Sequence, residues 1–161
     1  MWRTLLWFIL KLAIASLALY AFWEWRGQAA YALLFRWLAP PIYRLVGIEL
    51  ASLRGAVDVV GERFYNLLPF LSLMAAMWGI GWKRRLWGTV AGLAVIIAWH
   101  VTFPVIVRAI ISAHRLDPTA YIELSPWFLF SDSLPLLLWI VISHRPLFAA
   151  LKLTRKELPL G

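Results

Sequence analysis

Four long stretches of apolar residues constrain this chain more than any other feature of its sequence. They cover residues 4–23, 64–80, 86–107 and 124–143. A helix rises about 1.5 Å per residue, so roughly 20 apolar residues cross a hydrocarbon core about 30 Å thick. The sequence therefore predicts an all-α polytopic membrane protein with about four transmembrane helices.

The composition fits a bilayer better than water. Hydrophobic residues make up 63% of the 161-residue chain and charged residues 15%, against roughly 45–50% and 25% in soluble domains. A soluble domain of this length has too little interior to hide that much apolar surface. Trp is also abundant, with 11 copies, and it favours membrane–water interfaces.

Residues 28–60, between the first two apolar stretches, are too charged to cross a membrane. Their first half has a helical pattern that we expect Pro40 and Pro41 to stop, and their second half is amphipathic. Such a segment is typical of one that lies at the membrane interface or packs on the bundle. Whether it forms one bent helix or two stays open. Because the chain shows no linker or internal repeat, we expect residues 1–161 to form a single integral membrane domain.

The net charge of +8 is explained by how the chain is oriented in the membrane. Basic residues gather in the turn Lys83-Arg84-Arg85 and in the C-terminal tail, and short segments rich in Lys and Arg stay in the cytoplasm. We therefore expect both termini in the cytoplasm, and the first stretch to be an uncleaved signal anchor because no small residues follow it. The clustered cations then meet anionic lipid of the bilayer, and no soluble basic face remains for nucleic acid.

Polar side chains at membrane depth are the candidate functional residues, because their burial in hydrocarbon is costly. The predicted topology places four of them toward the outer side of three spans: Asn66, His100, Arg108 and Asp132. A bundle can gather them in one polar binding pocket, with Arg108 and Asp132 as an ion pair. Simpler interpretations compete: Arg108 snorkels to the headgroups, and Asp132 forms a structural salt bridge. Asn66 then makes a helix cap or an interhelical hydrogen bond, and His100 packs in the core.

Residue types and motifs that the sequence lacks exclude several kinds of chemistry. The chain has no cysteine, which excludes thiol nucleophiles, thiolate zinc sites and iron–sulfur clusters. It lacks HExxH, GxSxG and phosphate-binding glycine motifs, so we expect no metal ion, no cofactor and no catalytic residue. Three classes remain: an interaction protein, a membrane enzyme or small transporter that uses Asn66, Arg108 and Asp132, and a structural subunit of a larger membrane complex.

The order of elements over residues 55–139 resembles the exosortase/archaeosortase family of membrane transpeptidases. GAVDVVGERFYNLLPFLSLMAA is similar to the loop and span that carry the family's Cys-Ser-Gly motif. GWKRRLWGTVAGLAVIIAWHVTFPVIVRA is similar to its basic turn and Arg-bearing span, and FSDSLPLLLW occupies the place of its His-bearing segment.

The catalytic residues of that family are mostly absent here. Tyr65 and Asn66 stand where the Cys nucleophile belongs, Ser131 and Asp132 stand near the position of the His, and Arg108 alone matches. The resemblance therefore implies a non-catalytic accessory protein of such a protein-sorting system, in the inner membrane of a bacterium. Its expected partner is a sortase-like enzyme or the anchored substrate, bound through the outer polar pocket or the amphipathic segment.

Overall fold

The computed structural model describes residues 2–45, 47–49, 57, 61–77, 79, 81–114 and 119–156. Within these residues every regular element is helical. The elements are α1 (Trp2–Phe22), the π-helix η1 (Trp23–Gly27), α2 (Gln28–Leu45), the 3-10 helix η3 (Glu62–Asn66), α4 (Leu67–Ala76), α5 (Trp82–Ala113) and α6 (Thr119–Lys156). The predicted all-α class is thus confirmed for the described part of the chain.

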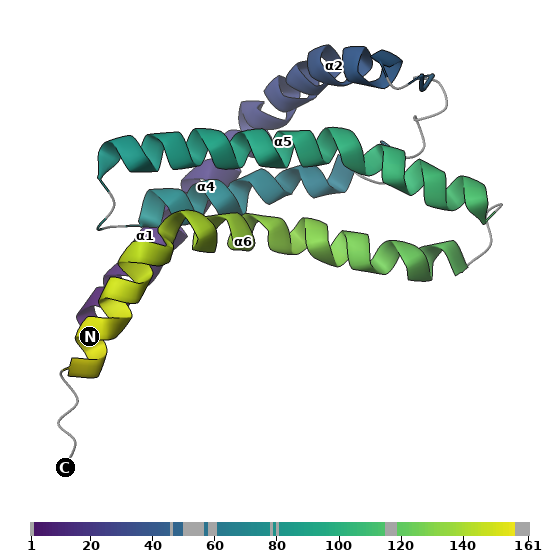
Figure 1. The fold of residues 1–161 in the computed structure, drawn as a ribbon. Coiled ribbons are helices and arrows are strands. Elements are labelled where there is room, and N and C mark those ends of the chain that lie inside the picture. The colour runs from purple at the N-terminus through teal and green to yellow at the C-terminus, as the bar shows by residue number, and fades with distance from the viewer. Residues whose placement is uncertain are drawn as a thin grey trace.

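The helices form an elongated bundle. Helix α5 runs antiparallel to α4 and α6, and the continuous unit of α1, η1 and α2 crosses these three obliquely (Figure 1). Three segments lie at the same end of the bundle: the start of α1, the end of α4 with the start of α5, and the end of α6 (Figure 1). A membrane crossed by the bundle would therefore have these three segments on one side.

Three helical segments are long and apolar enough to cross a membrane: Leu5–Leu45, Trp82–Ala113 and Tyr121–His144. The predicted span over residues 64–80 differs, because its apolar helix is the shorter Phe64–Ala76. A helix of that length reaches about 20 Å, less than the roughly 30 Å of a hydrocarbon core. It ends where Met77 turns extended, with ψ of 134°. Four complete spans are therefore not shown.

The short helix α4 lies at the centre of the bundle. It packs against α1, α5 and α6, and Leu67, Phe70 and Met74 on it are buried. Phe70 belongs to a core cluster that also contains Ile96 of α5 and Leu134 of α6. A half-length apolar helix thus holds three longer helices together.

Helices α4 and α5 meet closely at a glycine. A Cβ atom added to Gly92 would lie 2.1 Å from Cζ of Phe70, which is far inside van der Waals contact. One turn earlier, a Cβ at Gly88 would lie 2.6 Å from Cγ2 of Ile142 on α6. Two small residues four positions apart are typical of closely packed membrane helices. These glycines therefore set the spacing of α5 from both of its neighbours.

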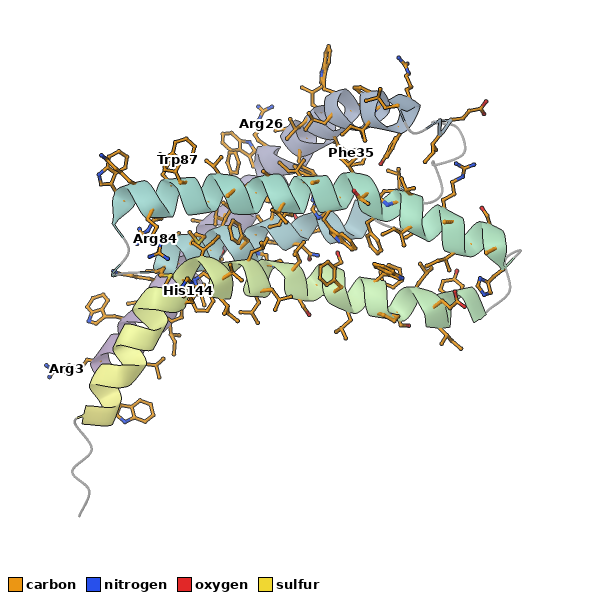
Figure 2. The ribbon with its side chains drawn as sticks, in the orientation of Figure 1. Arg3, Arg26, Phe35, Arg84, Trp87 and His144 are labelled. Atoms are coloured by element: carbon orange, nitrogen blue, oxygen red, sulfur yellow. The ribbon has the colours of Figure 1, made fainter. Side chains whose placement is uncertain are left out.

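The expected helix stop at Pro40 and Pro41 is wrong, because α2 continues through both prolines to Leu45. The cause is packing beyond them. The Tyr43 side chain is buried, and its hydroxyl donates a hydrogen bond to the Val101 carbonyl of α5 at 2.9 Å. Ala39 packs in the same cluster, and Phe35 lies between α2 and α5 (Figure 2). Of predicted segment 28–60, residues 46, 50–56 and 58–60 lie outside the described residues.

The junction between α1 and α2 is a π-helical turn. The backbone N–H of Gln28 bonds to the carbonyl of Trp23, five residues earlier. The Trp23 ring is buried against Gly27, where a Cβ atom would lie 2.9 Å from Trp23 Cε3. The widened turn thus lets a large indole fold over its own helix while α1 and α2 remain one continuous helix.

Candidate functional site

Asn66, a residue predicted for the polar pocket, joins two helices through a backbone carbonyl. Proline has no N–H, so Pro135 leaves the carbonyl of Ser131, four residues earlier, without its helical donor. Nδ2 of Asn66 donates a hydrogen bond to that carbonyl at 2.9 Å and lies 3.3 Å from Ser131 Oγ. Membrane helices tolerate proline where a neighbour supplies the missing donor in this way. Asn66 therefore binds α6 to the start of α4.

Two further carbonyls near prolines accept hydrogen bonds from other helices. Pro146 removes the helical donor of the Ile142 carbonyl, and Nη2 of Arg84 donates to that oxygen at 3.2 Å. Arg84 lies beside α6 where this helix changes direction (Figure 2). On α5, the Tyr43 hydroxyl donates to the Val101 carbonyl, three residues before Pro104. Asn66 and Arg84 thus supply hydrogen-bond donors to two carbonyls of α6 that prolines leave without their helical donors.

His100 lies in the interior between α5 and α2. Its side chain is fully buried, and its Nδ1 atom lies 2.6 Å from the Tyr31 hydroxyl. The Tyr31 ring meets the imidazole at 87°, and the centroid of the Phe64 ring lies 5.1 Å from it. Among the described residues no three His, Cys, Asp or Glu side chains are placed to hold a metal ion. These surroundings suit a packed, hydrogen-bonded histidine.

The contact between Tyr31 and His100 can be tested by removing one oxygen. We expect Tyr31→Phe to lower the free energy of unfolding by about 1–3 kcal/mol, since it leaves a buried ring nitrogen without this hydrogen bond. Thermal unfolding in detergent, followed by circular dichroism, measures the loss. Tyr121→Phe is the matched control, because Tyr121 is exposed on α6. Equal stability of the two variants would contradict a structural role for the pair.

The remaining predicted site residues lie on the two long helices. Arg108 is half-buried on α5, and Asp132 is exposed on α6 beside the buried Ser131. Asn66 and His100 have different partners, Ser131 and Tyr31 respectively. The Arg108–Asp132 ion pair stays a prediction, as does a pocket that joins all four residues.

A second polar group, which the sequence analysis missed, surrounds the π-helical junction. The Tyr65 hydroxyl donates to Oε1 of Glu24 at 3.2 Å, and Nε2 of Gln28 donates to the same oxygen at 3.3 Å. Gln28 also donates to the Tyr65 hydroxyl. Tyr65 and Glu24 are 41 positions apart, so no helical or motif spacing in the sequence connects them. Side chains of η3 and η1 bring them together, since the Tyr65 ring also contacts the Trp23 ring with 5.7 Å between their centroids.

An apolar groove of about 780 Å³ lies between α1 and α4. Small residues line part of it, including Ala13 and Ser16 of α1 and Ser72 of α4. The Ser72 hydroxyl is buried and has no hydrogen-bond partner among the described residues. The groove therefore has a largely apolar wall with small residues on both helices.

Comparison of the chain with protein-family models, with curated proteins and with solved structures found no match.

Proposed function

We propose that this chain is a non-catalytic integral membrane subunit that binds a transmembrane helix of a partner protein in the groove between α1 and α4. The groove is the observation behind this proposal. None of the most apolar window of the Leu5–Leu45 helix is buried within the chain, so this surface meets either lipid or another protein. Small residues at the groove allow a second helix to approach closely, as they do at helix interfaces in membranes.

Ser72 contributes to the groove by its small size. Its side chain is 2% exposed and lines the groove, and its hydroxyl is buried within the chain, out of reach of lipid and of a docked helix. Together with Ala13 and Ser16 it leaves room for a second helix to approach closely.

The inferred absence of catalysis is supported by how the polar side chains are used. Asn66 and Arg84 donate to carbonyls that prolines leave without helical donors. Tyr31 and His100 form a hydroxyl–imidazole pair, but His100 is 0% exposed, so a substrate has no direct access to the imidazole. A general base must reach the proton that it removes.

The finer form of the proposal follows the resemblance to exosortases. The chain is then an accessory protein of such a sorting system in the bacterial inner membrane, and its partner is the sortase-like enzyme or the anchored substrate. In this proposal both termini are cytoplasmic. The basic turn, the start of α1 and the end of α6 share one end of the bundle (Figure 1), which supports a common side for them. Basic segments near membrane helices favour the cytoplasmic side.

Site-specific photo-crosslinking tests the groove. A photoreactive amino acid at Leu17, which lines the groove and is 72% exposed, is compared with one at Leu129 of α6, which is 70% exposed elsewhere. We expect Leu17 alone to give an adduct with a co-expressed sortase-like enzyme or anchored substrate. Ser16→Trp, which fills the groove, should reduce that adduct at least fivefold.

Three outcomes would contradict the proposal. They are adducts of equal yield from both positions, adducts only with a second copy of the chain, and adducts with lipid alone. The chain is co-expressed separately with the enzyme and with the substrate. The one that forms the Leu17 adduct is the one that occupies the groove.

A further inference from the structure

A small pocket of about 300 Å³ opens beside the π-helical junction. Its volume is at the lower end of the range for small-molecule sites, roughly 300–1,000 Å³. Residues from η1, the start of α2 and η3 line it, and they include Trp23, Gln28, Tyr31, Gly61, Phe64 and Tyr65. The pocket shares Tyr65 with the groove between α1 and α4, but its other lining residues differ, so it is a second candidate binding site beside the first.

Aromatic rings make most of the wall of this pocket, and they face in different directions. Trp23 is inclined by 44° to Tyr31 and by 55° to Tyr65, and Tyr31 is inclined by 62° to Phe64. Centroid distances in these three pairs are 5.8, 5.7 and 5.1 Å. Rings in such mutual orientations form the sides of a box rather than a stack. The faces of aromatic rings carry negative partial charge and attract cations.

A carboxylate adds negative charge at the edge of the box. Glu24 Oε1 accepts hydrogen bonds from Tyr65 and Gln28, which both line the pocket. None of the described lining residues is basic. The nearest basic residue along η1, Arg26, holds its guanidinium 5.4 Å from the centroid of Trp25, a ring outside the pocket. The described side chains around the pocket therefore favour a cation and disfavour an anion.

We propose that the pocket bounded by Trp23, Tyr31, Phe64 and Tyr65, with Glu24 at its edge, binds an alkylammonium group. Aromatic boxes of this kind recognise quaternary and methylated ammonium ions, whose charge is spread over a bulky apolar surface. A bare metal ion fits less well, because oxygen-binding ions need several carboxylate or carbonyl ligands. No cluster of three such acidic or histidine ligands is present in the described part of the chain.

The position of the pocket along the helix admits two sources of this group. Glu24 follows α1, whose 21 residues extend about 31 Å, close to the thickness of a hydrocarbon core. When α1 crosses the membrane, the pocket lies near the depth of lipid headgroups. The ligand is then either the ammonium of a choline-type headgroup or a free ammonium solute.

Titration of the purified full chain with choline tests the proposal. In dodecyl maltoside, a detergent without ammonium groups, isothermal calorimetry should show saturable binding of choline. The neutral isostere 3,3-dimethyl-1-butanol should not bind, because it has the same shape without the charge. Glu24→Gln should weaken choline binding roughly tenfold, and Tyr65→Leu should do so by a similar factor.

Trp25→Leu is the matched control, since Trp25 is 75% exposed and lies outside the pocket. It should leave choline binding unchanged, and circular dichroism should show unaltered helix content in all three variants. Equal binding of the neutral isostere, or no saturable choline binding by the folded protein, would overturn the proposal. If Glu24→Gln fails to fold, the Tyr65→Leu comparison with Trp25→Leu still decides it.

Nanodiscs separate the two sources. Weaker choline binding in phosphatidylcholine discs than in phosphatidylglycerol discs supports the site and identifies the lipid headgroup as the competing occupant. Equal choline binding in both discs supports the site and identifies a soluble ammonium ligand. Binding that is lost in both kinds of disc would show that detergent created the site, which contradicts the proposal.

Discussion

Replacing Gly92 with alanine is expected to destabilise the bundle by about 2 kcal/mol. The added Cβ would lie 2.1 Å from Cζ of Phe70 and 2.8 Å from both of its Cε atoms. The Phe70 ring is completely buried, so it can move aside only by disturbing the centre of the bundle. Overpacking of this kind costs typically about 1–3 kcal/mol, and the better helix propensity of alanine offsets about 1 kcal/mol. A net loss of about 2 kcal/mol therefore corresponds to an overpacking cost of about 3 kcal/mol, the upper end of that range.

Reversible unfolding in mixed micelles, with increasing sodium dodecyl sulfate and far-ultraviolet circular dichroism, measures this loss. Gly81→Ala is the control, because a Cβ at Gly81 meets no atom within 4 Å. Its effect should stay within about 0.5 kcal/mol. Phe70→Leu in the Gly92→Ala protein should recover part of the stability, because the shorter side chain makes room for the methyl group. Equal stability of the Gly92→Ala and Gly81→Ala proteins would refute the close contact.

Replacing Asn66 with alanine is expected to cost about 2 kcal/mol, and the loss should depend on Pro135. The variant removes the donor to the Ser131 carbonyl, which Pro135 has already deprived of its helical partner. An unsatisfied buried carbonyl costs about 1–3 kcal/mol. In a Pro135→Ala protein the alanine N–H can bond to Ser131 along the helix. Asn66→Ala should therefore cost less than about 1 kcal/mol in that background.

The same unfolding measurement gives all four corners of this double-mutant cycle. Pro104→Ala supplies the matched background, because it also restores a backbone N–H but on α5, away from the Ser131 carbonyl. The cost of Asn66→Ala should be unchanged there, as for independent sites. A cost that is the same in the Pro135→Ala and Pro104→Ala backgrounds would mean that Asn66 does not compensate for the proline.

Long apolar runs were sufficient to predict the all-α class and three membrane-length helices. They were insufficient for residues 64–80, where the apolar run is long enough but the helix is shorter. Hydropathy records which residues avoid water, and it does not record whether they meet lipid or other helices. Phe70 and Met74 are buried by protein, so their apolar character serves packing within the bundle.

The candidate site was predictable to a smaller extent, because its contacts join distant segments. The cost of burying polar groups identified Asn66 and His100, but their partners Ser131 and Tyr31 come from other helices. The acceptor of the Asn66 hydrogen bond follows from the sequence, since a proline four residues after Ser131 predicts a carbonyl that lacks a donor. Which helix supplies the donor depends on how the helices pack.

Two other features show the same division between local and tertiary information. The four-residue spacing of Gly88 and Gly92 is a local pattern typical of closely packed membrane helices, although no contact was predicted from it. The end of α2 is not predicted by a local pattern. Pro40 and Pro41 favour a helix stop, but the burial of Tyr43 against Val101 outweighs that preference.

Because α1, η1 and α2 are continuous, they form one long helical segment that is held to the bundle at two places. The segment Leu5–Leu45 has 41 residues and extends about 60 Å, roughly twice the thickness of a hydrocarbon core. Its first arm rests on α4, and its second arm is held to α5 by Tyr31 and Tyr43. Helices adjust their tilt to bilayer thickness, and a rotation of about 10° displaces the end of a 30 Å arm by about 5 Å. A change in bilayer thickness that tilts this segment would thus strain the hydrogen bonds of Tyr31 and Tyr43 to α5.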